Sequence, residues 1–192
     1  MKKILIINGH PNKESFNLGL SEAYKKGAKE SGNEVKEILI GELEFTPNLE
    51  FGYQKRTELE PDLLKSWEKI KWAEHIVWVY PVWWGFMPAI LKGFLDRLFL
   101  PGFAFEYKEN SIKWDKLLKG KTAHIINTMD YPTWYYKWFI KEPGTKIIKK
   151  MILGFVGIKT IKTTYIGPMK NSSPAFREKW IKKVKTIGLK IK

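Results

Sequence analysis

Five short apolar runs alternate with segments of helical periodicity, and this alternation limits the folds open to the chain more than any other feature. Each run is bounded by polar residues, as is typical of strands buried in a parallel sheet. The runs cover residues 4–7, 35–40, 75–80, 122–128 and 160–166. The helical segments cover residues 15–31, 62–73, 88–99 and 147–155, and a last one begins near Ser173 and Pro174. The alternation predicts an α/β fold: a doubly wound five-stranded parallel sheet, built by right-handed crossovers, with helices on both faces.

The connections contain no repeat, low-complexity tract or interdomain linker, so we expect one domain over residues 1–192. Residues 35–40 are more amphipathic than the other apolar runs, which favours an edge position for that strand. Residues 41–60 form a long irregular connection, and loops of this length are usually functional or interfacial. The last helix is expected to bury Phe176, Trp180, Val184 and Ile187.

The chain carries a formal charge of +14 and no cysteine. The lack of cysteine excludes disulfides, thiolate metal sites and cysteine nucleophiles, and we expect a cytoplasmic protein without a metal. Only three of the 34 basic residues are arginines, and dispersed lysines favour a solvated surface over nucleic-acid binding. The charge should still attract anionic ligands such as dinucleotides. No apolar stretch reaches the roughly 18 residues of a membrane span.

In a doubly wound sheet, ligands bind at the carboxyl ends of the strands, where the strand order reverses. For the order 2-1-3-4-5 the relevant loops cover residues 9–17, 81–86 and 128–138. The first loop has neither a G-x-G-x-x-G nor a Walker sequence, which disfavours a nucleoside triphosphatase or an ordinary dehydrogenase. It offers His10, Ser15 and Asn17 beside free N–H groups at a helix N-terminus, which suits a phosphate. The alternative, in which Ser15 is merely an N-cap and His10 a loop residue, stays open.

Two sequence motifs stand at these loops. The first is Gly9-His10-Pro11 with Ser15-Phe16-Asn17, and the second is the run of residues 81–99 followed by Gly102-Phe103-Ala104-Phe105. Together they resemble the NAD(P)H dehydrogenase (quinone) family of flavodoxin-like proteins, and the resemblance extends from the first strand to the last helix. It implies a flavodoxin-like fold, a flavin cofactor (FAD or FMN), NAD(P)H as electron donor and a quinone or similar acceptor.

The resemblance also assigns roles to individual residues. The first loop would bind the flavin phosphate and ribityl groups, residues 81–85 would lie against the isoalloxazine, and Arg177 would approach the adenine of FAD. Physically, Pro81 ends a strand without an N–H, indoles offer flat apolar area, and Gly85 permits close approach. Two core tryptophans are a weaker alternative, since consecutive residues at a strand end point to opposite faces. The expected cofactor-binding residues are His10, Ser15, Phe16, Asn17, Pro81, Val82, Trp83, Trp84, Gly85, Thr128, Met129, Asp130 and Arg177.

The third loop departs from the family pattern. Residues 128–132 read Thr-Met-Asp-Tyr-Pro where a Thr-Gly-Gly turn is common, and no histidine follows that could relay charge near flavin N1. His75 and His124 are both expected on strands, so the relay does not transfer. Tyr131 could stand near the ring. The backbone N–H groups of Met129 or Asp130 would have to stabilise an anion at N1.

Phe105 and Tyr107 match family positions that line the substrate pocket of the partner subunit, so the resemblance implies a homodimer with sites at the interface. The aromatic run over residues 131–139, interleaved with Lys137 and followed by Lys141, suits a pocket wall or a dimer contact. A weak contact with a membrane surface is the less favoured interpretation of the same run.

We therefore expect a flavin-dependent NAD(P)H:quinone-type oxidoreductase. Hydride would pass from NAD(P)H to flavin N5, and after the nicotinamide leaves, two electrons would pass from the same face to the acceptor. Trp84, Gly85 and Tyr131 are the expected catalytic residues. Two alternatives remain: a flavin-binding regulatory subunit of a membrane transporter, and an electron carrier like flavodoxin.

Overall fold

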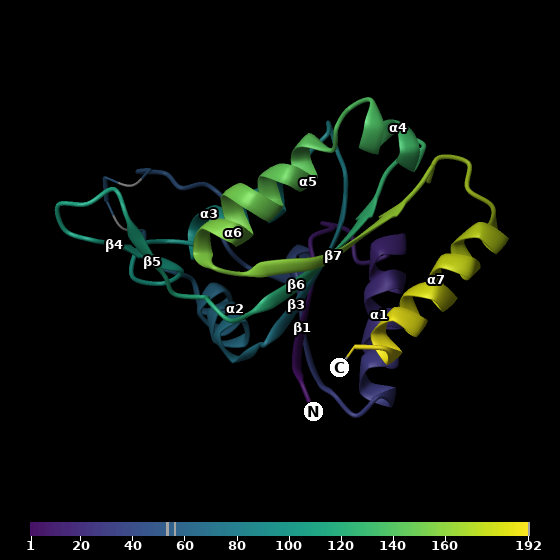
Figure 1. Ribbon diagram of the computed structural model, residues 1–192, viewed down its shortest axis with the longest axis horizontal. Coiled ribbons are helices and arrows are strands. Elements are labelled where there is room, and N and C mark those ends of the chain that lie inside the picture. The colour runs from purple at the N-terminus through teal and green to yellow at the C-terminus, as the bar shows by residue number, and fades with distance from the viewer. Residues whose placement is uncertain (53, 56, 192) are drawn as a thin grey trace.

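A parallel sheet forms the centre of the molecule in the computed structural model, which describes residues 1–52, 54–55 and 57–191. Neighbouring strands of the sheet all pair in parallel. In spatial order (Figure 1) the strands are β2 (Glu34–Leu39), β1 (Lys3–Asn8), β3 (His75–Pro81), β6 (Thr122–Thr128) and β7 (Lys159–Ile166). This order confirms the expected 2-1-3-4-5 topology and places the amphipathic strand β2 at one edge.

Helices cover both faces of the sheet, as predicted. On one face, α1 (Phe16–Glu30) and α7 (Pro174–Leu189) lie side by side (Figure 1). The other face carries α2 (Pro61–Trp72), α3 (Ala89–Leu98) and a continuous helical segment composed of α5 (Pro143–Ile147), the π-helical η2 (Ile148–Leu153) and α6 (Gly154–Val156). No helix in the described part of the chain is long and apolar enough to cross a membrane.

The expected burial along α7 is only partly observed. Val184 is fully buried, whereas Phe176, Trp180 and Ile187 are partly buried against the same apolar cluster. The reason is the close approach of α1, where a methyl group on Gly188 would lie 2.4 Å from the carbonyl oxygen of Tyr24. Backbone contact between the two helices leaves less room for large side chains between them.

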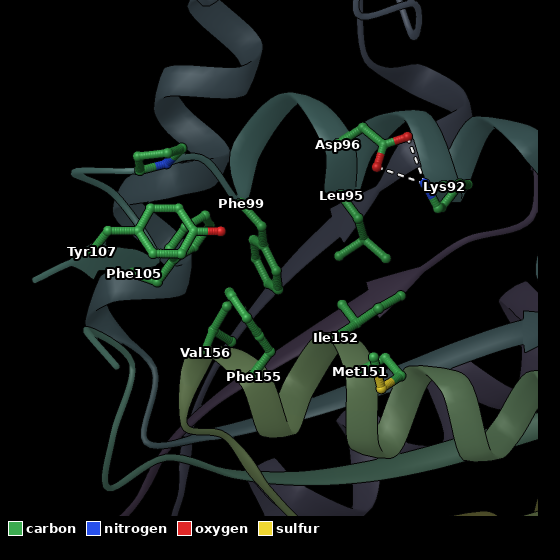
Figure 2. A pocket seen from close by; sticks show the side chains of 11 residues that line it. Lys92, Leu95, Asp96, Phe99, Phe105, Tyr107, Met151, Ile152, Phe155 and Val156 are labelled. Carbon is green, nitrogen blue, oxygen red and sulfur yellow. Dashed lines mark hydrogen bonds and ion pairs between the residues drawn. The ribbon is translucent and has the colours of Figure 1, made fainter. Parts of the chain in front are cut away.

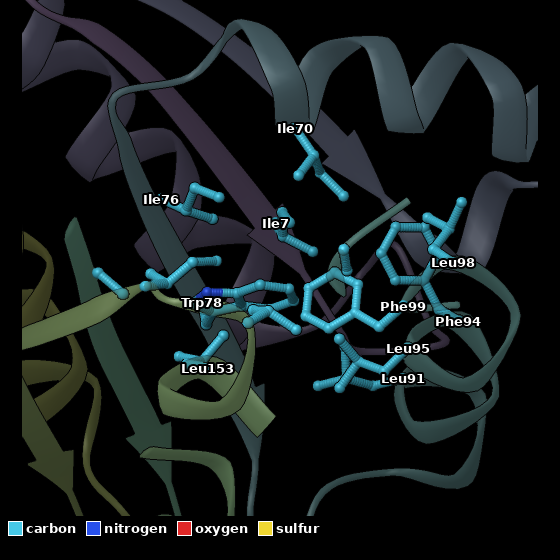
Figure 3. Packing of buried hydrophobic residues seen from close by; sticks show 14 of the residues in the cluster. Ile7, Ile70, Ile76, Trp78, Leu91, Phe94, Leu95, Leu98, Phe99 and Leu153 are labelled. Carbon is cyan, nitrogen blue, oxygen red and sulfur yellow. The ribbon is translucent and has the colours of Figure 1, made fainter. Parts of the chain in front are cut away.

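The core divides into two clusters because successive residues of a strand point to opposite faces. Ile6 of β1 packs in the cluster under α1 and α7, whereas its neighbour Ile7 packs in the cluster under α2 and α3. Trp78 of β3 lies fully buried in the second cluster, among side chains of α3 and Leu153 of η2 (Figure 3). This indole packs α3 and η2 against the central strand, and both helices flank the loops at the carboxyl edge.

Four short elements were not predicted. β4 (Phe105–Tyr107) and β5 (Trp114–Lys116) form a two-stranded antiparallel hairpin, α4 (Thr133–Trp138) follows β6, and the 3₁₀ turn η1 (Ile40–Glu42) follows β2. Strands of three residues are too short to show a period of two, and one helical turn is too short to show a period of 3.6. They therefore fell in segments that the sequence identifies only as loops.

The long connection after β2 is anchored by the buried guanidinium of Arg97 in α3. Nη1 of Arg97 donates to the carbonyl oxygen of Thr46 at 2.6 Å, and Nη2 donates to that of Glu58 at 2.7 Å. Both nitrogens also bind the carboxylate of Glu60, at 3.0 and 2.9 Å. A fork of donors of this kind holds an irregular segment in one conformation. The connection is thus fixed at both its ends to the helix layer.

Two histidines lie within the sheet, as the sequence analysis expected. Nδ1 of His75 lies 2.7 Å from Oγ1 of Thr122, and Nε2 of His124 lies 2.9 Å from Oγ1 of Thr164. Burial lowers the pKa of His75 to about 4 and that of His124 to about 3. Both imidazoles are therefore neutral in the folded protein near pH 7.

We predict that stability falls as the pH is lowered from 6.5 to 5. In this window the unfolded chain binds protons at His75 and His124 that the folded chain does not, so each imidazole lowers the free energy of unfolding by up to about 1.4 kcal/mol per pH unit. Urea titrations at several pH values measure this. The His124→Gln variant should show a shallower slope, and an unfolding free energy of the wild type that is constant over this window would contradict the prediction.

Candidate functional site

A cavity of about 470 Å³ opens at the carboxyl edge of the sheet. The strand registers produce it, because Asn8 of β1 pairs with Val79 of β3, and Pro81 of β3 pairs with Thr128 of β6. The loops that follow these strands therefore leave the sheet close together. Every expected cofactor-binding residue lines this cavity except Trp84 and Gly85. The lining also includes four residues that were not predicted from the sequence: Asn12, Met169, Lys170 and Asn171.

The first loop ends at the N-terminus of α1. Ser15 is the N-cap, and its Oγ accepts a hydrogen bond of 3.3 Å from the N–H of Leu18. This confirms the N-cap interpretation, which is compatible with anion binding, since within the described residues the N–H groups of Phe16 and Asn17 donate to no protein atom. The first turn carries no acidic side chain. The positive end of the helix is thus free to attract an anion.

His10 lies near the start of the first loop, whereas Ser15 lies at its end. Its Nδ1 accepts a hydrogen bond of 2.9 Å from the N–H of Asn12, and its ring meets that of Trp83 edge to face at 5.5 Å between centroids. Partial burial lowers the pKa of His10, opposed by a weaker effect of the Asn12 carbonyl. The imidazole is therefore neutral near pH 7 and contributes a polar, planar surface rather than a charge.

Asn17 joins the first and third loops. Oγ1 of Thr128 donates to Oδ1 of Asn17 at 2.9 Å, across 111 residues of sequence. The side chain of Asn17 is buried, yet its Nδ2 has no partner in the described part of the chain. Buried polar groups are nearly always hydrogen-bonded, so an amide donor left over at a cavity wall indicates a missing acceptor. A ligand oxygen in the cavity would supply it.

A tight turn after β3 forms one wall of the cavity. Trp83 and Phe86 exchange backbone hydrogen bonds of 2.9 Å in both directions, while Trp84 and Gly85 have φ of +50° and +79°. These features define a type I′ turn, whose first central position is usually Asn, Asp or Gly. A tryptophan there costs about 1–3 kcal/mol, and strain of this size is commonly found at functional sites.

The indoles of this turn are not core residues. Trp84 is fully exposed and Trp83 is 44% exposed, which rules out the alternative weighed from the sequence. The N–H groups of Trp84 and Gly85 donate to no atom of the described residues. The turn therefore presents flat apolar rings together with two free backbone donors.

The third loop is held by backbone bonds on both sides. Its Thr128 carbonyl accepts from the N–H of Val82 at 2.7 Å, and the Met129 N–H donates to the Ile166 carbonyl at 2.9 Å. The expectation that the Met129 N–H faces a ligand is therefore wrong, because β7 already uses it. The N–H of Asp130 makes no such bond within the described chain. Asp130 is the remaining donor of the pair.

Tyr131 does not line the cavity. Its ring is turned toward Tyr135, with 6.4 Å between centroids, and it is partly exposed. Gly167 packs against the carbonyl oxygens of Met129 and Tyr131, so the main chain on both sides of Asp130 lies against the segment that follows β7. The expected catalytic position of Tyr131 is thus not seen in a single chain.

A fourth loop, after β7, completes the cavity. The N–H of Met169 donates to the Met129 carbonyl at 2.9 Å, which brings Lys170 to the lining. Nε of Arg177 donates to Oγ of Ser172 at 2.9 Å, and its guanidinium lies 5.9 Å from the ring centroid of Phe16. Two cationic side chains, those of Lys170 and Arg177, therefore line the cavity. The sequence could have indicated this loop only by its position, because the fifth strand ends at the same edge of the sheet as the first, third and fourth.

Phe105 and Tyr107 lie in a different place. They line a second cavity of about 540 Å³ between α3 and the η2–α6 segment (Figure 2). The ring of Phe105 meets those of Tyr107 and Phe155 edge to face, at 5.2 and 4.9 Å. At the rim, Lys92 binds Asp96 at 2.6 Å. Within one chain these residues do not reach the first cavity, so their role opposite a partner's site stays a prediction.

A hydrogen bond at the start of α5 and a backbone contact of α5 support the type I′ turn. The Tyr165 hydroxyl donates to the carboxylate of Glu142, the left-handed residue (φ +47°) that precedes α5. Burial and this hydrogen bond hold the pKa of Tyr165 well above its ordinary value, so the phenol stays protonated. At the second residue of α5, a methyl group on Gly144 would lie 2.2 Å from the carbonyl oxygen of Gly85. The start of α5 is therefore in direct backbone contact with the type I′ turn.

The sheet order 2-1-3-4-5 with helices on both faces is a flavodoxin-like arrangement. The model of the flavodoxin-like fold family matches residues 2–186. The chain belongs to this family.

Two curated relatives are similar over most of the chain. NAD(P)H dehydrogenase (quinone) 1 of Rattus norvegicus is 25% identical over 216 residues, which cover 97% of this chain and 78% of the relative. An uncharacterized NAD(P)H oxidoreductase of Haemophilus influenzae is 30% identical over 168 residues, which cover 85% of this chain and 82% of the relative.

Solved structures share the whole fold of this flavodoxin-like protein. Smu.1420 from Streptococcus mutans is 34% identical, with a TM-score of 0.85 over 98% of this chain and 99% of that one. An FMN-dependent NADH-azoreductase of Bacillus anthracis, solved with FMN, is 21% identical, with a TM-score of 0.74 over 98% of both chains. At that identity the second comparison shows the fold alone.

We predict that Gly144→Ala weakens flavin binding as well as stability. The new methyl group must displace the backbone of the type I′ turn, and overpacking of this kind costs about 1–3 kcal/mol. Denaturant unfolding and quenching of FMN fluorescence measure the two effects. Gly19→Ala is the matched control, because its methyl would meet only the flexible end of Ile181 at 3.2 Å. Wild-type stability and flavin affinity in Gly144→Ala would refute the contact.

Proposed function

We propose that the chain is a flavin-dependent NAD(P)H:quinone-type oxidoreductase, and that the cavity at the carboxyl edge holds the flavin. The observation that carries this proposal is the composition of the cavity lining. Cationic Lys170 and Arg177, the N-terminal residues of α1 and the indole of Trp83 line one cavity. A flavin nucleotide needs the same combination, since it carries an anionic phosphate and a flat tricyclic ring.

The residues present fit this group. The unpartnered Asn17 amide and the N–H groups of the first turn of α1 are donors for phosphate or ribityl oxygens. The free N–H groups of Trp84 and Gly85 are donors for the polar edge of the ring. The Asp130 N–H is the donor that we propose for flavin N1. FMN and FAD share the phosphate and the ring that these donors would bind, and the family resemblance would place the adenine of FAD near Arg177.

Bound flavin would supply the redox chemistry, taking a hydride from NAD(P)H and then passing two electrons to a quinone or similar acceptor. The residues of the chain would bind and orient the flavin and stabilise the charge that develops on it. The strained turn holds its donors in place before the ligand arrives, which is the way in which backbone N–H groups stabilise developing charge most effectively. His10 is neutral near pH 7, and the pKa values of Tyr136 and Tyr165 are raised by burial, so we assign no side chain the role of general acid.

The relatives support this proposal through their names: a quinone-linked NAD(P)H dehydrogenase, an NAD(P)H oxidoreductase and an FMN-dependent azoreductase. We also propose a homodimer in which the groove around Phe105 and Tyr107 faces the turn of the partner subunit. That arrangement would give the fully exposed Trp84 an apolar neighbour and would enclose the acceptor.

Steady-state oxidation of NADH and NADPH with menadione tests the function. The flavin-loaded protein should turn over with at least one of the two donors, and its rate should depend on the concentrations of donor and acceptor in the parallel-line pattern of a two-stage reaction. A protein that binds flavin but is not reduced by either nucleotide would instead favour the electron carrier or the regulatory subunit.

We predict that Arg177→Gln lowers the affinity for FMN by about tenfold to hundredfold, because a charge-assisted contact to phosphate is worth roughly 1.5–3 kcal/mol. The affinity for riboflavin, which lacks the phosphate, should not change. Fluorescence titrations of the apoprotein measure both. Lys179→Gln, an exposed cation of the same helix outside the cavity, is the control. Equal losses for FMN and riboflavin would show that Arg177 does not contact the phosphate.

A further inference from the structure

The short helix α4 exposes an unusual set of side chains. Trp134, Tyr135, Trp138 and Phe139, here called the aromatic face, are between 39% and 75% exposed. Three of the rings lie against one another: Phe139 stacks on Tyr135 at 5.5 Å between centroids and meets Trp134 at 6.0 Å. None of the four lines either cavity of the preceding sections. Large rings gathered on one surface of a water-soluble fold indicate a contact surface.

The charges in and after α4 are mainly positive. Residues 131–156 contain five lysines and a single acidic residue, Glu142, whose carboxylate accepts the hydroxyl of Tyr165. Lys137, Lys141 and Lys146 are exposed, and none of them forms a salt bridge within the described residues. The aromatic face therefore belongs to a segment in which basic side chains outnumber acidic ones, and the ammonium of Lys137 lies 5.2 Å from the ring centroid of Tyr165.

We propose that the aromatic face docks on the surface of an anionic lipid bilayer. Tryptophan and tyrosine are the side chains that settle at the boundary between lipid headgroups and acyl chains, and lysines nearby are attracted to anionic headgroups. A bilayer offers an apolar interior to the aromatic rings and negatively charged headgroups to the lysines. The position of α4 fits a planar partner, since the helix projects at the periphery, beyond the start of α5 and away from the centre of the sheet (Figure 1).

Docking would also select the acceptor. α4 begins at Thr133, directly after the loop that carries Thr128, Met129 and Asp130 to the cavity. A chain bound through α4 would therefore hold its cavity close to the lipid, where quinones with long isoprenoid tails are dissolved. This consequence rests on the proposed oxidoreductase function, whereas docking itself does not.

Flotation with vesicles tests the docking. The flavin-loaded wild type should float with vesicles of phosphatidylcholine and phosphatidylglycerol, and about tenfold less with phosphatidylcholine alone. Trp138→Ser/Phe139→Ser should lose about tenfold in binding to the anionic vesicles, whereas Ile112→Ser, at a side chain 95% exposed on the distant β4–β5 hairpin, should bind as the wild type does. Lys137→Gln/Lys141→Gln should bind more weakly than Lys26→Gln/Lys29→Gln, a pair exposed on α1.

Three results would overturn the proposal. The wild type could fail to float with either vesicle, the two lysine pairs could weaken binding equally, or the aromatic variant could float like the wild type while its oligomeric state changes. The last result would assign the face to contact between copies of the chain. Turnover of soluble menadione in the absence of lipid, measured on the same variants, separates the two proposals: turnover without flotation removes only docking, and flotation without turnover removes only the oxidoreductase.

Discussion

The site depends on the parallel ladder that aligns the ends of β1, β3 and β6. Because these strands run in one direction and in register, their loops leave the sheet at one edge, and three further contacts then fix the loops to one another. Thr128 bonds to Asn17 through its side chain and to Val82 through its carbonyl, and Met129 bonds to Ile166. Each contact links residues that are far apart in sequence, so the cavity forms only when the whole sheet has formed.

Among the loops at this edge of the sheet, the strained turn at Trp84 is the clearest sign of function. A left-handed tryptophan with a fully exposed ring contributes nothing to the core and costs stability. It persists because Trp83 and Phe86 close the turn on one side and Gly144 of α5 supports it on the other. The hydrogen bond between Tyr165 of the edge strand and Glu142 holds the start of α5 in place. It therefore supports the turn indirectly, through the backbone contact of Gly144.

The strand order, the helix layers and most of the cavity lining could be predicted from the sequence, since buried runs, helical periods and the run of residues 81–99 are continuous signals. The loop with Lys170 could not, because it has no periodicity and reaches the cavity only through the bond from Met169 to Met129. The position of Tyr131 and the use of the Met129 N–H depend in the same way on how the chain packs against β7. Such partners are set by tertiary contact, which no local pattern encodes.

The proposed oxidoreductase function requires that a flavin binds in the cavity at the carboxyl edge of the sheet. A crystal structure of the chain with FMN is the most direct measurement. We expect the phosphate at the N-terminus of α1 beside Lys170 and Arg177, and the ring against Trp83 with its polar edge toward the N–H groups of Trp84 and Gly85. FMN bound in the groove between α3 and η2, or with its ring away from the type I′ turn, would contradict the account.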